Sequence, residues 1–310
     1  MSTLICGSMA YDTIMVFHDK FKNHILPEKV HMLNVSFLVP VIRREFGGCA
    51  GNIAYNLKLL GESPNIMASV GHDFEPYAQW LNHCQISTDY IKICDDHYTG
   101  QAYITTDEDD NQITAFHPGA MNSSHENSVP DDLDISIGIV SPDGKEGMQL
   151  HAREFSEQGI PFIFDPGQGM PMFNGDELLE LINLATYATF NDYESELMQE
   201  RTGLTLEQLA ERVDALVVTR GGEGSSVYTD GKCIEIPSAK AKQLSDPTGC
   251  GDAYRAGLLY GIMNELDWET TGRIASLLGS IKIEHHGTQN HSFTMESFKD
   301  RYAECFGSSF

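Results

Sequence analysis

Positive charge is scarce in this sequence. Lysine and arginine together number 20, against 45 aspartates and glutamates, which gives a formal net charge of −25 at pH 7. A field of that sign repels phosphate backbones and anionic lipid head groups, so the composition argues against a protein that binds nucleic acid or a membrane surface. Any site that binds a phosphate must therefore depend on groups in its immediate surroundings and not on the overall charge.

Other features are missing as well. The seven cysteines are scattered and include no CxxC pair, which fits reduced thiols in a cytoplasmic protein better than a disulfide framework or a zinc ribbon. No segment approaches about 18 uninterrupted apolar residues, and the first residues lack a basic stretch, so we expect neither a membrane span nor a targeting segment. The 310 residues suffice for one large domain with a small appendage.

Four common ligand-binding motifs do not occur where they would be needed. GxxxxGK[ST] is absent, which excludes a P-loop nucleoside triphosphatase, and the twelve histidines include no HExxH zinc motif. GSMAYD follows the first apolar run, where a dinucleotide-binding oxidoreductase would carry GxGxxG. The acidic run from Asp107 begins like an EF-hand loop, but Gln112 replaces the required glycine, so we interpret it as a hairpin turn.

Short apolar runs alternate with helical patterns along most of the chain. The expected strands cover residues 4–7, 65–70, 135–141, 161–165, 186–190 and 215–219. The expected helices cover residues 47–61, 74–84, 148–158 and 177–185, with two more after Gly251 and Thr270. Such alternation predicts an α/β fold, a mostly parallel sheet covered by helices on both faces.

Two β-rich segments, residues 13–46 and 91–117, interrupt this alternation. Both lie between strands of the expected sheet, and open α/β sheets bind ligands beyond the carboxyl ends of their strands. We therefore expect the two segments to form one small sheet, a lid that folds over the site. Residues 1–12, 47–90 and 118–310 then make up the α/β domain.

The strongest chemical signal is DPTGCGDAYRAG at residues 246–257, just before an apolar helical run. Glycines around one small residue let main-chain amides converge at a helix N-terminus, where the helix dipole favours a phosphate. Asp252, in the first turn, would point to the same place and suits a base that accepts a proton from a hydroxyl. An ordinary capped helix start would explain Thr248 and Asp252 but not the glycine pattern.

This segment resembles the second signature of the ribokinase or PfkB family of carbohydrate and nucleoside kinases, which reads DTTGAGD followed by aromatic-x-AG. GGCAGNIAYNLKLLG at residues 47–61 is similar to the first signature of that family. Pro247 and Cys250 depart from the usual threonine and alanine, but neither removes an amide of the 248–251 loop. The resemblance implies a ribokinase-like fold with a small β-sheet lid and ATP-dependent phosphoryl transfer to an alcohol.

For catalysis, the resemblance implies that Asp252 is the general base. It also implies an anion hole, which would stabilise the charge that develops on the transferred group, made by the amides of Gly249, Cys250 and Gly251.

On the acceptor side, the resemblance implies that Asp12 and Asn52 hold adjacent sugar hydroxyls. Gly48 would let the sugar ring approach the main chain. A helix cap is the alternative role for Asn52.

On the donor side, the resemblance implies an ATP site at Asn191, Thr219, Gly221, Gly224 and Thr248. A simple β-turn is the alternative for the two glycines. Glu194 matches the last residue of the family's NxxE element, which implies that it orders Mg²⁺ through water; a solvated carboxylate at a helix start is the alternative. Asp246 resembles a position near a monovalent cation such as K⁺.

The choice of acceptor rests on Phe17, Phe37, Phe116 and the Met-rich stretch 169–173, which offer either an apolar slot for a base or the core of the lid. GSMAYD and AFHPGAMN look closest to the bacterial adenosine-kinase-like branch, and Gln168 is a candidate to bind a base edge. We expect a kinase for the 5′-hydroxyl of adenosine or a related nucleoside, with free ribose or another carbohydrate as the alternative acceptor. Both a monomer and a homodimer formed through the lid remain open.

Overall fold

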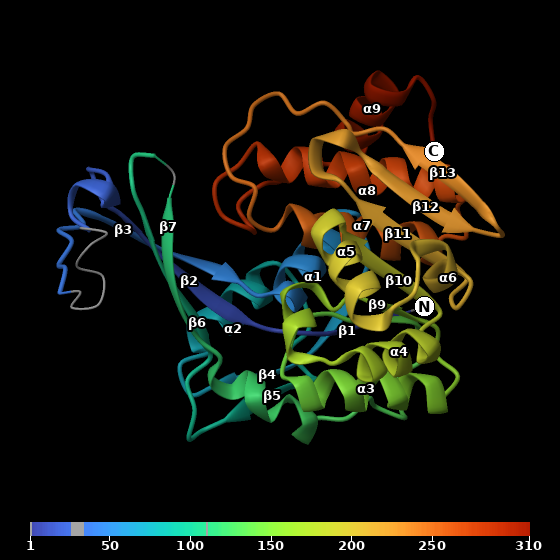
Figure 1. The fold of residues 1–310 in the computed structure, drawn as a ribbon, viewed down its shortest axis with the longest axis horizontal. Coiled ribbons are helices and arrows are strands. Elements are labelled where there is room, and N and C mark those ends of the chain that lie inside the picture. The colour runs from blue at the N-terminus through green and yellow to red at the C-terminus, as the bar shows by residue number, and fades with distance from the viewer. Residues whose placement is uncertain (1, 26–33, 110) are drawn as a thin grey trace.

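The computed structural model describes residues 2–25, 34–109 and 111–310. Within these residues the chain forms a nine-stranded sheet with helices on both faces and a separate four-stranded sheet that projects to one side (Figure 1). The large sheet has the order β13 (Lys232–Ile236), β12 (Ser225–Thr229), β11 (Ala215–Thr219), β10 (Tyr187–Asn191), β9 (Phe162–Phe164), β8 (Ile135–Val140), β1 (Ser2–Cys6), β4 (Pro64–Gly71) and β5 (Ile91–Cys94).

Two apolar cores lie on opposite faces of this sheet. In β1, Ile5 packs into one core, whereas Leu4 and Cys6 pack into the other, because successive side chains of a strand point to opposite faces. The described helices are α1 (Cys49–Leu59), α2 (Glu75–His83), α3 (Lys145–Glu157), α4 (Gly175–Leu184), α5 (Asp192–Thr202), α6 (Leu206–Ala210), α7 (Cys250–Met263), α8 (Trp268–Ile283) and α9 (Met295–Phe306). None of them is long and apolar enough to cross a bilayer.

The strand order places the ligand-binding edge. Strands β8 to β11 are parallel to one another, and β1 lies between β4 and β8, pairing with both in parallel. The chain leaves β1 toward β4 on one side and later returns to β8 on the other. This is a topological switch point, where open α/β sheets leave a crevice beyond the carboxyl ends of the strands.

The expected α/β pattern is present, with additions that the sequence did not indicate. Strands β12 and β13 extend the sheet by antiparallel pairing, and α3 begins at Lys145, three residues before the expected start. Helices α6 and α9 were also not anticipated, and a helix at α5 was considered only as the alternative for Glu194. Helix α6 has only five residues, and the apolar side chains of α5 gather on no single face, so apolar periodicity gave no signal for either helix.

The small sheet has the order β3 (Val41–Gly47), β2 (Ala10–Val16), β6 (Gly100–Thr106) and β7 (Gln112–His117). Its bounds differ from the expected lid at two places. The segment 91–94 belongs to the large sheet as β5, where it pairs in parallel with β4, and residues 10–12 already pair with β3 and β6. The alternation of apolar and polar residues in IKIC suits an edge strand of either sheet, so only the pairing decides.

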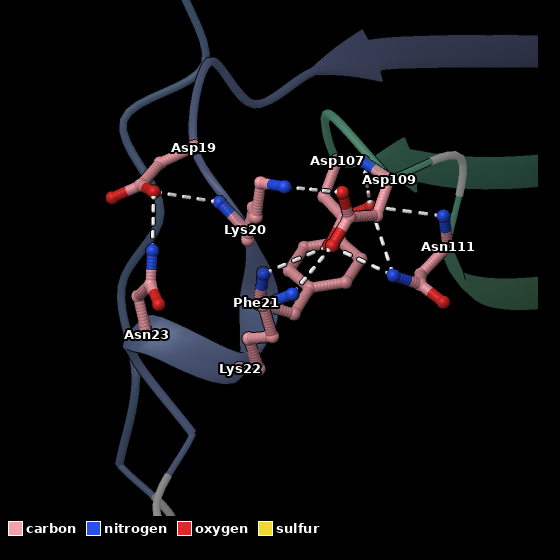
Figure 2. A network of polar contacts seen from close by, with 8 residues as sticks. All are labelled: Asp19, Lys20, Phe21, Lys22, Asn23, Asp107, Asp109 and Asn111. Carbon is pink, nitrogen blue, oxygen red and sulfur yellow. Dashed lines mark hydrogen bonds and ion pairs between the residues drawn. The ribbon is translucent and has the colours of Figure 1, made fainter.

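The far end of the small sheet is tied together by the turn between β6 and β7. Figure 2 shows the carboxylate of Asp107 accepting hydrogen bonds from the amides of Phe21, Asp109 and Asn111 at 2.9–3.0 Å. The ammonium of Lys20 reaches Asp109 in the same network. The expected hairpin turn is therefore present, and its acidic residues fasten the turn to the segment after β2.

Candidate active site

The N-terminus of α7 presents main-chain amides toward open space. Gly249 caps the helix with a φ of +78°, a left-handed conformation that glycine adopts without steric cost. Among the described residues, the amides of Gly249 and Gly251 donate to no acceptor, whereas the amide of Cys250 donates to the carbonyl of Pro247 at 3.2 Å. Of the three amides expected in the anion hole, Cys250 is thus already engaged in a turn, and two are free.

Asp252 lies in the first turn of α7, next to these amides. Its Oδ2 accepts a hydrogen bond from Nδ2 of Asn52, in α1, at 2.8 Å. Burial raises the pKa of Asp252 to about 6, a shift that the hydrogen bond from Asn52 opposes and the nearby carboxylate of Asp165 reinforces. A carboxyl group with a pKa near the working pH is suited to accept a proton from an attacking hydroxyl.

Asp12 approaches the same place from the lid. It lies in β2, directly opposite Glu45 and Ala102 on the neighbouring strands. A Cβ atom at Gly47 would overlap the carboxylate of Asp12, so glycine is required there for the observed position. Burial, together with the charges of Asp252 and Glu45, raises the pKa of Asp12 to about 6. The carboxylate expected to bind the acceptor and the carboxylate expected to act as the base are therefore close enough to interact.

Gly47 and Gly48, at the start of α1, let the main chain pack closely against the segment that contains Ser8, Met9 and Asp12. Gly48 caps α1 with a φ of +88°, and a Cβ atom there would lie 2.5 Å from the carbonyl oxygen of Ser8 and 2.6 Å from Cα of Met9. Asn52, one turn further, is 4% exposed and does not cap the helix. One N–H of its amide donates to Asp252, and the other meets no acceptor among the described residues.

The raised pKa values of Asp12 and Asp252 predict an acid limb in the activity. The roles predicted for both groups require the ionised form, and a carboxylate with a pKa of about 6 becomes protonated as the pH falls through that value. We therefore expect kcat/KM to decrease below about pH 6, by ~1 to 2 log units per pH unit if both protonations matter. A pH–rate profile of wild type against an Asp12→Asn variant tests this, and an equally steep limb in both would contradict a role for Asp12.

Phe116 is in β7, opposite Ala102, which is itself opposite Asp12. Directly paired residues share a face of a sheet, so Phe116 and Asp12 lie on the same face, two strands apart. The ring of Phe116 is 54% exposed. Gln168, in the turn after β9, is exposed and approaches the sulfur of Cys49 at the start of α1.

The remaining apolar candidates form cores instead of a base slot. Phe17 packs against Phe21 and Phe37 at the far end of the lid, with ring centroids 5.9 and 4.8 Å away. In the Met-rich stretch, Met170 and Phe173 are buried in one of the two main cores. Aromatic and thioether groups serve both purposes, and their sequence positions did not distinguish them.

A cavity of about 370 Å³ lies on the other side of the α7 N-terminus. Gly251 lines it, as do three of the expected ATP residues, Thr219, Gly221 and Gly224. Asn191 and Thr248 are not among its lining residues. The lining that the sequence did not single out is mostly small or apolar: Gly222, Ser238, Ala239, Lys240, Ala241, Leu244, Pro247, Tyr254, Ser276, Gly279, Ser280 and Ile283. Apolar walls with few polar groups suit a purine ring.

Asn191 and Glu194 form a capping box at the start of α5. Oδ1 of Asn191 accepts from the amide of Glu194 at 2.7 Å, and Oε2 of Glu194 accepts from the amide of Asn191 at 2.8 Å. Burial and the charge of Asp165 raise the pKa of Glu194. Oε1 of Glu194 makes no hydrogen bond within the described residues, so capping leaves one carboxylate oxygen for another ligand.

The carboxylate oxygens and the carbonyl oxygen of Asp246 all accept hydrogen bonds. Its two carboxylate oxygens accept from the amides of Thr248 and Gly287, both at 2.9 Å, and its carbonyl oxygen accepts from the ammonium of Lys282 at 2.8 Å. Burial alone would raise the pKa of Asp246, but the hydrogen bonds from the two amides hold it below its usual range.

Several residues at the site were not anticipated. Arg255, in α7, makes a buried two-point hydrogen bond with Asp165 at 2.9–3.0 Å, and Lys282 is fully buried behind the loop. The only signal for Arg255 was a charged residue within an apolar helical run, which indicates a buried partner. Gln289 donates to Asn52 from the loop after α8, and no local pattern marks it.

Comparison with known proteins places this geometry in a family. Residues 9–295 match the pfkB family carbohydrate kinases. A nucleoside kinase of Methanocaldococcus jannaschii is 33% identical over 276 residues, 88% of this chain and 91% of that one. The structure of Burkholderia thailandensis nucleoside kinase in complex with inosine is 48% identical, with 99% of both chains covered and a TM-score of 0.91. The same kinase in complex with ADP-inosine is 50% identical, with 99% and 97% covered and a TM-score of 0.88. The chain therefore belongs to the pfkB family of carbohydrate kinases.

Proposed function

We propose that this protein is an ATP-dependent nucleoside kinase that phosphorylates the 5′-hydroxyl of its acceptor. The observation that carries the proposal is that the residues expected to bind the acceptor and the cavity expected to bind ATP both lie at the N-terminus of α7. Asp12 and the free N–H of Asn52 offer an acceptor and a donor to two sugar hydroxyls on one side, and the cavity lined by Gly251 lies on the other. Relatives that cover nearly the whole chain are nucleoside kinases, one of them with inosine bound.

In the proposed reaction Asp252 removes the proton of the 5′-hydroxyl. The 5′-oxygen forms a bond to the γ-phosphorus of ATP, the bond to the bridging β–γ oxygen breaks, and ADP leaves. The free amides of Gly249 and Gly251 donate to the oxygens of the transferred group, where the dipole of α7 adds to the stabilisation. With the 2′ and 3′ hydroxyls held by Asp12 and Asn52, the 5′-carbon is the end of the ribose that points to Asp252.

Mg²⁺ would supply charge neutralisation on the phosphates when bound. Glu194 is the group that fits it best, because Oε1 is free of other partners and a cation would offset the burial that raises the pKa of this carboxyl. No cluster of three or more His, Cys, Asp or Glu side chains that could hold a metal occurs in the described part of the chain. The ion would therefore rest on ATP and on one carboxylate, directly or through water.

A monovalent cation fits this chain poorly. Each carboxylate oxygen of Asp246 already accepts from a main-chain amide, and the ammonium of Lys282 donates to the carbonyl of Asp246 and to the carbonyl of His285 at 3.1 Å, so a positive charge already lies beside this loop. Burial lowers the pKa of Lys282, and the charge of Asp246 opposes that shift. We infer that the ammonium of Lys282 takes the place of K⁺. It links the 246–251 loop to the segment after α8 by donating to the carbonyls of Asp246 and His285.

Accordingly, we expect K⁺ to be dispensable. Replacing K⁺ by tetramethylammonium at constant ionic strength should change kcat by less than about twofold, because the chain supplies the cation itself. The melting temperature should not rise with K⁺ either. A Lys282→Met variant is the comparison, and it should lose activity. A wild type that is inactive without K⁺ would show that Lys282 does not replace the ion.

The base is expected to stack on Phe116. This ring lies on the same face of the small sheet as Asp12, two strands away. Two strand spacings are about 9–10 Å, which matches the distance from a ribose hydroxyl to the far side of a base. Stacking adds roughly 1 kcal/mol, so Phe116→Ala should lower kcat/KM for inosine about fivefold or more. Activity on free ribose should not change.

Tyr103 offers a matched control, since it is exposed on the adjacent strand but points to the opposite face of the lid. Tyr103→Ala should leave both substrates unaffected. Equal losses for inosine and ribose in Phe116→Ala would instead indicate a general effect on the lid.

The function itself is tested by incubating the purified protein with γ-phosphate-labelled ATP, Mg²⁺ and either inosine or adenosine. We expect label in a product from which 5′-nucleotidase releases phosphate. Label that appears only when ribose or another carbohydrate is added would favour the sugar kinase, which shares every step at Asp252.

A further inference from the structure

A line of hydrogen bonds from three other elements ends at Asp252. The indole Nε1 of Trp80, in α2, donates to Oε1 of Gln289 at 2.8 Å. Nε2 of Gln289 donates to Oδ1 of Asn52 at 3.0 Å, and Nδ2 of Asn52 donates to Asp252 at 2.8 Å. Gln289 is 2% exposed, so water does not compete for these bonds. None of the roles described above uses Gln289 or Trp80.

Trp80, at the start of this line, determines which group donates and which accepts in each of the following hydrogen bonds. The indole N–H can only donate, so the oxygen of the Gln289 amide must face Trp80 and its nitrogen must face Asn52. Tyr77 agrees with this orientation: its hydroxyl donates to the carbonyl of Gly47 at 2.9 Å and accepts from Nε2 of Gln289 at 2.6 Å.

The orientation of Asn52 follows from Gln289. The two ends of an amide have nearly the same shape, so packing alone does not choose between them. With the nitrogen of Gln289 as its neighbour, Asn52 turns its oxygen toward Gln289 and its nitrogen toward the active site. The opposite orientation would place a carbonyl oxygen against the carboxylate of Asp252 and remove the donor that Asn52 offers to a sugar hydroxyl.

We propose that Gln289, oriented by Trp80, is a positioning residue that keeps an N–H of Asn52 directed at Asp252. Neither residue touches the reacting atoms. Their effect reaches the reaction through Asn52, which tunes the base and binds the acceptor. The kinetic part of this inference rests on the proposed kinase function, whereas the orientation of Asn52 and its effect on Asp252 do not.

The charged and titratable groups around Asp252 determine which way its titration moves. Asp165, after β9, raises its pKa, while Arg255, in α7, and the thiol of Cys49, in α1, lower it. Asp252 also interacts with Asp12 of β2, Cys250 of α7, Lys282 of α8 and Tyr77 of α2. None of these contacts changes when Trp80 or Gln289 is replaced, except the one with Tyr77. The loss of the hydrogen bond from Asn52 therefore raises the pKa of Asp252.

Trp80→Phe is the first test. It removes the indole donor but keeps an aromatic ring to stack on Phe46, whose centroid is 5.7 Å away. Gln289 then becomes free to reverse, and Asn52 with it. We expect the acid limb of the kcat profile to move to higher pH by about half a unit or more, because Asp252 must lose its proton to act.

Gln289→Met and Gln289→Glu extend the test from the other side. Methionine has nearly the same length and no donor, so it should shift the limb in the same direction as Trp80→Phe. Glutamate accepts from Trp80 with one oxygen and turns the other toward Asn52, which must then reverse, so its shift should be the largest. Gln208→Glu adds the same charge at a capping box of α6, where glutamate serves equally, and should leave the profile unchanged.

A titration of Asp252 that needs no activity keeps the test independent of the proposed function. The carboxyl carbons of selectively labelled aspartate report the pKa by NMR in the ligand-free protein, with Asp252→Asn providing the assignment. We expect a higher pKa of Asp252 in Trp80→Phe and in Gln289→Met than in wild type. If both variants fold and titrate as wild type does, or lose only melting temperature, the proposal is wrong, whether or not wild type phosphorylates a nucleoside.

Discussion

Replacing Asp252 by asparagine should lower kcat at least about 100-fold, the scale on which a positioned general base contributes. The side chain keeps its shape and can still accept the hydrogen bond from Asn52, so the fold and the binding of ATP should persist. Because burial raises the pKa of Asp252 to about 6, its ionisation at neutral pH destabilises the folded state relative to the unfolded state. The neutral asparagine should therefore leave the melting temperature unchanged or raise it.

Asp176 provides a matched control for this variant. It is also a first-turn aspartate, but it lies at the exposed start of α4. Asp176→Asn should keep wild-type kcat. An Asp252→Asn enzyme that turns over within about threefold of wild type would mean that another group accepts the proton.

The second large effect concerns the sugar hydroxyls. A nucleoside that lacks the hydroxyl held by Asp12 leaves a partly buried carboxylate without its donor, which costs on the order of 1–3 kcal/mol or about 5- to 150-fold in kcat/KM. We expect that loss for either 2′-deoxyadenosine or 3′-deoxyadenosine with the wild-type enzyme. In an Asp12→Ala variant the same loss should nearly disappear, because the partner is already gone.

This comparison forms a double-mutant cycle between one protein group and one substrate group. Its coupling identifies which hydroxyl Asp12 binds, and melting curves of the variant show whether the lid still folds. Deoxynucleosides that lose the same activity with Asp12→Ala as with wild type would remove Asp12 from the acceptor site.

Much of this architecture was predictable from local patterns. The strands with continuous apolar runs, such as 135–141 and 215–219, are close to their expected bounds. The glycine pattern around residues 249–251 predicted a helix start with exposed amides, because only a few backbone conformations bring such amides together. That Asp12 and Asp252 meet was implied only by the resemblance to the family, since 240 residues separate them.

Other features depend on contacts that no local pattern encodes. The edge strand β5 could join either sheet, and its place follows from pairing with β4. Phe17 and Phe116 are both aromatic residues of the small sheet, yet one is buried in a cluster and the other is exposed. Lys282 and Gln289 reach the site only because the end of α8 and the segment after it pack behind the start of α7, which is a consequence of tertiary packing and not of sequence periodicity.

We propose that the acceptor is a nucleoside and that its base contributes to catalysis. The most direct measurement is kcat/KM with ATP for adenosine, inosine, cytidine and free ribose under one set of conditions. We expect adenosine or inosine to exceed ribose by at least about 10-fold, because binding of the base orients the 5′-hydroxyl at Asp252. A value for ribose or a hexose phosphate above that of every nucleoside would contradict the claim, even though phosphoryl transfer itself would stand.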